Sequence, residues 1–230
     1  MASEVVHATG GHGHDPNLQH HFHSMDQQLE ASTLGMWVFL VTEIMFFGGM
    51  FMAYILYRIL YPEAWVLGSH HLNVSLGALN TGVLICSSLT MALAVRSAQV
   101  SSRKGQIVNL VLTILLGSTF LVVKYFEYKE KFEHHLVPGP HFDMSLPQAA
   151  QQQLFFSIYF MLTGIHAAHM IVGIVLMFVI LVMAMRNRFS SAYYTPVEIS
   201  GLYWHFVDIV WIFLFPLLYL LGAHLGAHGG

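Results

Sequence analysis

Five long, almost uncharged stretches constrain how this chain can fold more than any other feature. They cover residues 32–60, 72–97, 106–128, 153–185 and 197–222. A helix needs roughly 20 mostly apolar residues to span a bilayer, and backbone groups in lipid must be hydrogen-bonded within the protein. The stretches lack the period-2 alternation of barrel strands. The sequence therefore predicts an all-α protein, a bundle of five transmembrane helices.

The composition supports this class. Hydrophobic residues make up 56% of the 230 residues and charged residues only 9%, whereas soluble domains carry about 25% charged residues. The net charge of −3 argues against nucleic acid as a partner. The one cysteine, Cys86, lies in an apolar run, and we interpret it as a small buried side chain.

Polar segments flank and connect the stretches. Residues 1–31 form a Gly- and His-rich tail, and residues 223–230 form a short C-terminal tail. The histidines could bind a metal adventitiously, but a flexible polar tail is the simpler interpretation. The first 30 residues contain no Lys or Arg and no apolar core, so no removable signal peptide is predicted. Residues 61–71 and 134–147 contain proline and glycine stop signals, which predict loops.

Lysine and arginine near the ends of the stretches indicate the orientation. One side of the membrane receives five of them and the other three or four. Because cytoplasmic loops carry the excess of Lys and Arg, this bias predicts a cytoplasmic N-terminus and a C-terminus outside. The five on the cytoplasmic side are Arg96, Arg103, Lys104, Arg186 and Arg188.

Glu43 lies near the middle of the first stretch, about 13 Å into the helix at 1.5 Å per residue. A charge at the bilayer centre costs at least about 2.5–3.5 kcal/mol. The carboxyl is therefore expected to be protonated or paired with another residue. Two interpretations stay open: a proton-linked function, or a hydrogen bond that fixes helix packing.

Two histidines stand in the fourth stretch between Gly164 and Gly173. His166, His169 and Gly173 follow one another at i, i+3 and i+7, so they share one helical stripe. Two imidazoles could ligate a metal or heme. They could equally hydrogen-bond to a neighbouring helix, where small residues allow close packing. No cysteine or acidic residue lies nearby in this stretch, which favours packing.

The fifth stretch carries one polar stripe on an otherwise apolar helix. Such a stripe must be buried against protein or line a wet path. His205 and Asp208, three residues apart, can hydrogen-bond along the helix. The stripe consists of Glu198, Gly201, His205 and Asp208.

The end of the third stretch holds a cluster of charges. Lys124, Glu127 and Lys131 lie at three- and four-residue spacing, which suits local ion pairs. The sequence predicts an ion ladder here, at the membrane edge. Glu127 lies deeper than Glu130 and is a candidate for a further role.

Five motifs, in this order and spacing, resemble subunit III of the heme-copper oxidases, the cytochrome c oxidase group. In "GSTFLVVKYFEY", Lys124 stands where Gln is common in that family. The resemblance covers about residues 32–221. The other four motifs are STLGMWVFLVTEIMFF with its glutamate, LNTGVLICSS, GIHAAHMIVG and GLYWHFVDIVWIFLF.

The resemblance implies a non-catalytic subunit of a proton-pumping terminal oxidase in a bacterial plasma membrane. The chain itself would bind no heme or copper; these would lie in the catalytic subunit I and the copper-binding subunit II. The complex would oxidise cytochrome c or quinol and reduce O2 to water. This chain would stabilise subunit I, support proton uptake and bind phospholipid. Longer members have seven helices, so a small fourth subunit would replace the first two.

No catalytic or metal-binding residue is implied in this chain. The buried polar positions that match the family are Glu43, Glu127, His166, His169, His205 and Asp208. The matching packing glycines are Gly164, Gly173 and Gly201.

Three other functions remain open from the residues. The chain could serve a quinol oxidase or a nitric oxide reductase. It could be a small cytochrome b that uses His166 or His169 with His205. It could also be an ion or proton transporter that uses Glu43 and Asp208.

Overall fold

The computed structural model describes residues 22–140, 142–190 and 193–220. Residues 1–21 of the predicted N-terminal tail and the predicted tail 223–230 lie outside this part. Five of the helices are long and apolar enough to cross a membrane, which confirms the predicted all-α bundle. The helices are α1 (Met25–Leu60), α2 (Pro62–His70), α3 (Val74–Gln99), α4 (Arg103–Glu133), α5 (Ala149–Met185) and α6 (Thr195–Tyr219).

The short helix α2 replaces part of a predicted loop. Pro62 occupies its first turn, where the missing N–H of proline is tolerated. Trp65 is 1% exposed and packs edge-on against Phe155, with ring centroids 5.6 Å apart. A Cβ at Gly68 would lie 2.4 Å from the Phe155 ring. This glycine therefore permits a close approach of α2 to α5 and does not stop a helix.

Helix ends are set by local hydrogen bonds. The Ser24 side chain accepts from the Gln27 backbone N–H, so α1 begins at Met25, seven residues before the predicted start at residue 32. Two residues after the ends of α3, α4 and α5, the backbone of a non-glycine residue is left-handed. These residues are Ser101, His135 and Asn187, with φ of 54–56°. The N–H after each donates to a carbonyl five residues back, which satisfies an otherwise unpaired group at the helix end.

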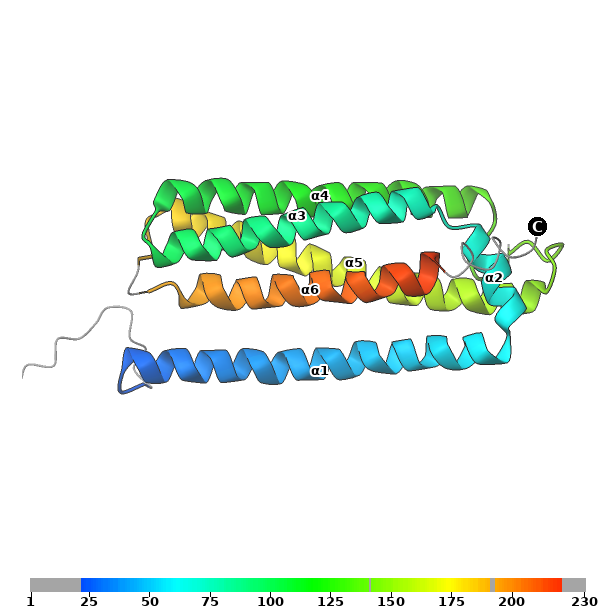
Figure 1. The fold of residues 1–230 in the computed structure, drawn as a ribbon, viewed down its shortest axis with the longest axis horizontal. Helices are drawn as coiled ribbons and strands as arrows, with labels where there is room; N and C mark the ends of the chain where they lie inside the picture. The colour runs from blue at the N-terminus through cyan, green and yellow to red at the C-terminus, as the bar shows by residue number, and fades with distance from the viewer. Residues whose placement is uncertain (1–21, 141, 191–192, 221–230) are drawn as a thin grey trace, which may run out of the picture.

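The long helices run side by side (Figure 1). Helix α3 packs along α4, α6 packs against α3 and α5, and α1 lies against α6 and α5. Helix α2 lies at the end of the bundle where α1 finishes. The N-terminal end of α1 and the C-terminal end of α6 are at opposite ends of the bundle (Figure 1). With 37 residues, α5 is about 55 Å long and exceeds the roughly 30 Å hydrocarbon core.

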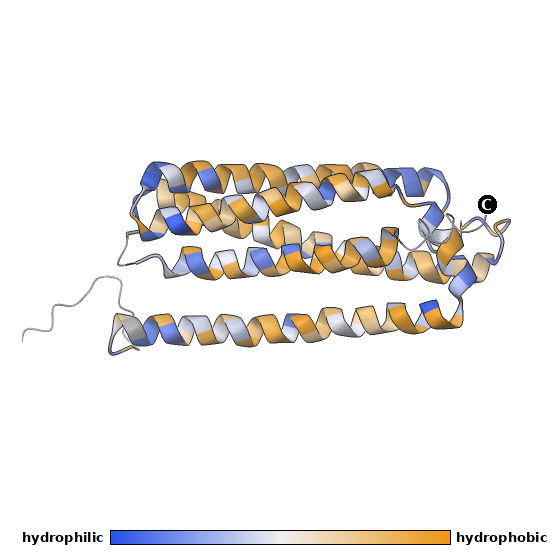
Figure 2. Cartoon of the chain, in the orientation of Figure 1, coloured by the Kyte–Doolittle hydropathy of each residue, from blue (hydrophilic) through white to orange (hydrophobic). Residues whose placement is uncertain are grey.

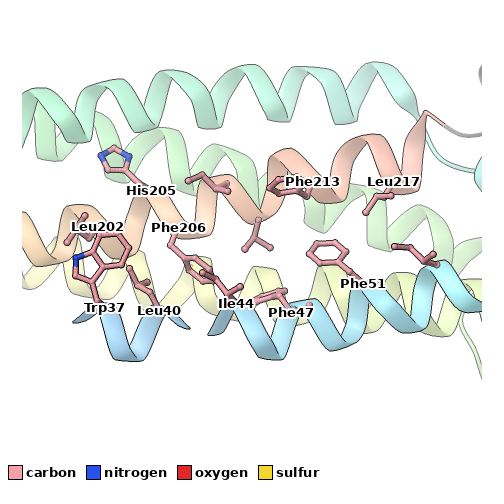
Figure 3. A pocket seen from close by; sticks show the side chains of 14 residues that line it. Trp37, Leu40, Ile44, Phe47, Phe51, Leu202, His205, Phe206, Phe213 and Leu217 are labelled. Carbon is pink, nitrogen blue, oxygen red and sulfur yellow. The ribbon is translucent and has the colours of Figure 1, made fainter. Parts of the chain in front are cut away.

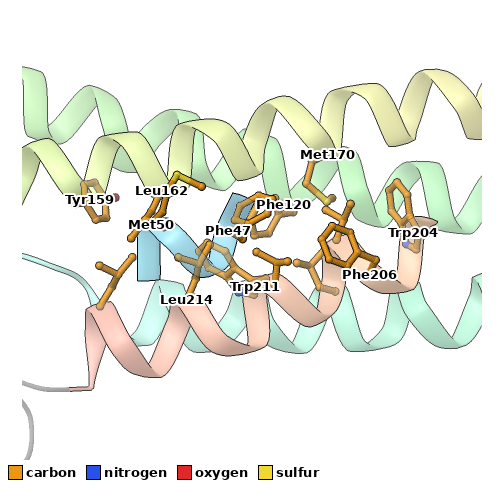
Figure 4. Packing of buried hydrophobic residues seen from close by; sticks show 14 of the residues in the cluster. Phe47, Met50, Phe120, Tyr159, Leu162, Met170, Trp204, Phe206, Trp211 and Leu214 are labelled. Atoms are coloured by element: carbon orange, nitrogen blue, oxygen red, sulfur yellow. The ribbon is translucent and has the colours of Figure 1, made fainter. Parts of the chain in front are cut away.

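Large side chains fill the space between the helices (Figure 4). Phe120, Trp204 and Trp211 are each 0% exposed. The outer faces are equally apolar: Met45 is 73% and Ile59 71% exposed, and Figure 2 shows hydrophobic residues along the helices with hydrophilic ones gathered at their ends. This surface suits contact with lipid.

Cys86 does not have the buried position that was predicted. Its side chain is exposed on α3. An apolar run does not identify a buried face when lipid, and not water, surrounds the helix. The thiol therefore lies on the outer surface of this chain.

Candidate functional site: polar side chains within the bundle

Glu43 of α1 pairs with His169 of α5. Its Oε2 lies 3.1 Å from His169 Nε2, and the two side chains are 18% and 20% exposed. The Phe47 ring packs edge-on against the imidazole at 5.2 Å. The Glu43 partner, which the sequence alone did not identify, is thus a histidine 126 residues away.

The second ring nitrogen limits the protonation states of this pair. His169 Nδ1 lies 2.9 Å from the Ile165 carbonyl oxygen, which can only accept, so Nδ1 carries a proton. Nε2 then either accepts from a protonated Glu43 or, in an imidazolium, donates to its carboxylate. Both arrangements hold the same number of protons and have zero net charge. The pair can therefore exist within the bundle without an unbalanced charge.

Lys124 and Glu127 form the centre of a closed buried network. Lys124 Nζ donates to Glu127 Oε2 at 2.9 Å, to the Tyr159 hydroxyl at 3.2 Å and to the Tyr219 hydroxyl at 2.8 Å. Both hydroxyls donate to Glu127 Oε1, at 2.9 and 2.5 Å. All three ammonium donors have partners. The network joins α4 to α5 and α6.

This arrangement confirms the predicted Lys124–Glu127 pair but corrects the rest of the ion ladder that was predicted at the membrane edge. Lys124 and Glu127 are 3% and 1% exposed, so they lie inside the bundle. Lys131 does not pair with Glu127: its Nζ donates to the His71 carbonyl oxygen at 2.5 Å and lies 4.0 Å from Glu130. The spacing predicted only pairs along one helix, because it says nothing about the two tyrosines that come from other helices.

Lys131 also lines a polar pocket of about 400 Å³ at the α2 end of the bundle, together with His71, His134 and Asp143. Burial, and then the positive charge of Lys131, lower the pKa of His71. This pocket mixes cationic and acidic groups. No described set of three or more His, Cys, Asp or Glu residues, here or in the bundle, could hold a metal ion.

A row of hydrogen bonds joins α3 to α6. Trp204 Nε1 donates to the Ser87 hydroxyl at 2.9 Å, and Trp211 Nε1 donates to the Thr81 hydroxyl at 3.1 Å. Ser88 Oγ lies 2.6 Å from His205 Nδ1. The motifs LNTGVLICSS and GLYWHFVDIVWIFLF therefore contact each other along this row. His205 pairs with Ser88 and not with Asp208 of its own helix.

The rings of His166 and His169 lie against different aromatic side chains. His166 is 0% exposed, and its ring lies against Phe120 at 5.4 Å and Trp211 at 5.3 Å. Neither ring nitrogen has a hydrogen-bond partner among the described residues. The two imidazoles thus lie on one broad face of α5. His166 points towards α4 and α6, and His169 points towards α1.

The predicted packing glycines differ in how closely they are approached. A Cβ at Gly173 would lie 3.0 Å from the Trp204 ring, and one at Gly201 would lie 3.0 Å from Val95. At Gly164 the nearest atom would be the Tyr128 hydroxyl at 3.8 Å, so a methyl group has room there. Gly117, which the sequence did not single out as a packing residue, is the closest to Trp204, at 2.7 Å.

The fold and these contacts define a polytopic helical membrane protein whose buried polar side chains join its helices to one another. The family model of "Cytochrome c oxidase subunit III" matches residues 17–223, and this chain belongs to that family. It is thus a subunit III of a heme-copper oxidase, an oxygen-reducing complex.

Individual relatives agree with this membership. The chain is 36% identical over 191 residues to the cytochrome c oxidase subunit 3 of Corynebacterium diphtheriae. The aligned residues cover 82% of this chain and 87% of the relative. This chain is 31% identical over 201 residues to the quinol oxidase subunit 3 of Bacillus subtilis, covering 86% and 92%. With the cytochrome c oxidase subunit 3 of Papio hamadryas it shares 30% over 197 residues, covering 82% and 69%.

Proposed function

We propose that this chain stabilises the catalytic subunit of a proton-pumping terminal oxidase and supports its proton uptake, with no redox centre of its own. The contacts of the family motifs support this role. Glu43 is paired with His169, and the motif residues Ser87 and Ser88 hold Trp204 and His205. These side chains join helices to one another, as a scaffold subunit requires.

The proposed partners are a heme-bearing subunit I, a copper-binding subunit II and a small fourth subunit. The test is purification of the tagged chain in mild detergent, with mass spectrometry of the chains that come with it. We expect a heme-containing partner and O2 consumption by the purified complex. Recovery of the chain alone from membranes that retain oxidase activity would contradict the proposal.

The proposed electron donor is cytochrome c. Its support is the match to the family model of cytochrome c oxidase subunit III, together with 36% identity to the Corynebacterium cytochrome c oxidase subunit. The same purified complex distinguishes the donors. Oxidation of reduced cytochrome c is expected; oxidation of quinol alone would instead favour the quinol oxidase alternative.

Glu43→Gln is expected to preserve assembly and most O2 reduction. A glutamine amide can donate to His169 Nε2, so one hydrogen bond of about 1 kcal/mol is exchanged for another. Glu43→Leu is the matched control, because it leaves Nε2 unpaired at a cost of about 1–3 kcal/mol. O2 consumption and subunit content of the purified complex measure both. Complete loss of turnover in a fully assembled Glu43→Gln complex would assign this carboxyl a direct role in proton transfer.

Bound phospholipid is a further part of the proposal. An apolar groove of about 610 Å³ lies between α1 and α6 (Figure 3). Trp37, Ile44 and Phe51 line it from α1, and Leu202 and Phe213 line it from α6. Its lining is suited to an acyl chain, because hydrocarbon needs no hydrogen-bond partner.

Gly48→Leu is expected to reduce the lipid retained by the purified chain. Gly48 lines the groove, and a Cβ added there meets no atom within 4 Å, so we expect the leucine side chain to occupy part of the groove. Gly82→Leu on α3 is the control, since Gly82 has the same free space outside the groove. Native mass spectrometry counts the bound lipids. Equal retention by the two variants would place the lipid elsewhere.

The chain is proposed to lie in a bacterial plasma membrane with the N-terminal end of α1 in the cytoplasm. The five Lys and Arg residues beside the ends of α3, α4 and α5 support this orientation. Membrane-impermeant thiol labelling of a Cys86→Ser chain, with a new cysteine at Lys104 or at Lys129, tests it. Labelling of the Lys104 position from outside intact cells would reverse the orientation.

A further inference from the structure

A second intramembrane cavity, of about 290 Å³, lies between α3 and α6. Ser88 and Asp208 line this cavity but not the groove at α1. His205 lines both. The remaining lining of the cavity is apolar, and three of these residues, Ile85, Ile209 and Ile212, are 45–54% exposed on the outer surface. The cavity therefore lies beside the membrane-facing surface of the bundle.

Asp208 is the unsatisfied group in this cavity. It is 3% exposed, and neither carboxyl oxygen has a hydrogen-bond partner among the described residues. Ser88 is near enough to interact with it, but the hydrogen bond of Ser88 goes to His205. A hydroxyl has one proton. Even if Ser88 turned it towards Asp208, one carboxyl oxygen would still have no donor.

An unpartnered carboxyl inside a membrane protein is unfavourable. Two other acidic side chains within the bundle have partners: Glu43 has His169, and Glu127 has Lys124 and two tyrosines. A lipid tail can fill a cavity but cannot donate a hydrogen bond. An occupant that reaches this site from the membrane must therefore bring a hydrogen-bond donor.

We propose that this cavity receives a hydrogen-bond-donating side chain from a transmembrane helix of another oxidase subunit, which pairs with Asp208. The face formed by Ile85, Ile209 and Ile212 is then part of the interface. This inference rests on the association with other subunits that is proposed above. It adds the face, the residue and the chemistry of the contact.

The test compares the isolated chain with the purified complex for Asp208→Leu. In the isolated chain we expect an unchanged or higher unfolding temperature, because an unpaired carboxyl is removed. In the complex we expect this chain to dissociate in detergent about tenfold faster or more, since a hydrogen bond to a charged or polar partner is lost. Asp208→Asn keeps a hydrogen-bond acceptor but removes the charge. The variant chain should therefore stay in the complex if the partner's donor is neutral and dissociate from it if that donor is cationic.

Other results would overturn the inference. A lower unfolding temperature of the isolated Asp208→Leu chain would mean that the carboxyl is satisfied within this chain. Unchanged dissociation from the complex would mean that water alone fills the cavity. Failure of the unaltered chain to co-purify with any oxidase subunit would instead contradict the proposed function, so the two failures are distinguishable.

Photocrosslinking locates the partner in the assembled complex. A benzophenone maleimide is attached to Ile212→Cys in a Cys86→Ser background, and Val175→Cys on α5, 57% exposed, is the matched control. We expect an adduct with an oxidase subunit from the Ile212 position, and its loss in the Asp208→Leu complex. Equal adducts from both positions, or lipid adducts alone at Ile212, would contradict the assignment.

Discussion

Lys124→Met should lower the free energy of unfolding by about 3–5 kcal/mol, the cost of removing one partner from a buried ion pair. The change leaves Glu127, 1% exposed, without its cation. It also removes the donor that the Tyr159 and Tyr219 hydroxyls accept from. Denaturant unfolding of the purified chain in detergent, followed by circular dichroism, measures the loss.

Two comparisons make this result specific. The double variant Lys124→Met/Glu127→Gln should cost less than Lys124→Met alone, because no uncompensated charge remains. Lys129→Met is the surface control: its ion pair with Glu133 is 3.8 Å long with both side chains more than half exposed, and its loss should cost less than about 1 kcal/mol. A Lys124→Met chain no less stable than Lys129→Met would show that the network contributes no stability.

Trp204→Ala should be destabilising by about 3–5 kcal/mol, as large-to-small changes in a packed core are. The indole is 0% exposed. It lies between α4 and α5, where Cβ atoms at Gly117 and Gly173 would come within 2.7 and 3.0 Å of its ring, and its Nε1 donates to Ser87. Because the two residues that face the indole are glycines, they have no side chains that could fill the space left by its removal. The same unfolding measurement applies.

Trp204→Phe separates packing from hydrogen bonding. It keeps most of the ring and loses the bond to Ser87, so it should cost clearly less than Trp204→Ala. Trp37→Ala is the control for tryptophan removal in general, because Trp37 is 53% exposed and lines the groove between α1 and α6. Equal losses at Trp204 and Trp37 would contradict the central role of the Trp204 contact.

The predicted elements succeeded and failed for identifiable reasons. The five spans were predictable because a transmembrane helix satisfies its own backbone hydrogen bonds. Its apolar length can therefore be recognised from one continuous segment of the sequence. Helix α2 was not predicted, since Pro62 and Gly68 were interpreted as stop signals. In the structure the proline begins the helix, and the glycine admits the Phe155 ring. A residue type that ends one helix can start another or permit a contact, and only its neighbours decide which.

The sequence by itself determined the membrane class, the number of spans and, through five ordered motifs, the family. It also predicted which polar residues stand within the long apolar helices. Only the tertiary structure decided what they contact: Glu43 meets a histidine 126 residues away, and Lys124 meets tyrosines 35 and 95 residues away. In a helix that is apolar on all sides, periodicity does not mark the inner face. The rotation of each helix, and with it every polar pairing, follows from how the five helices pack together.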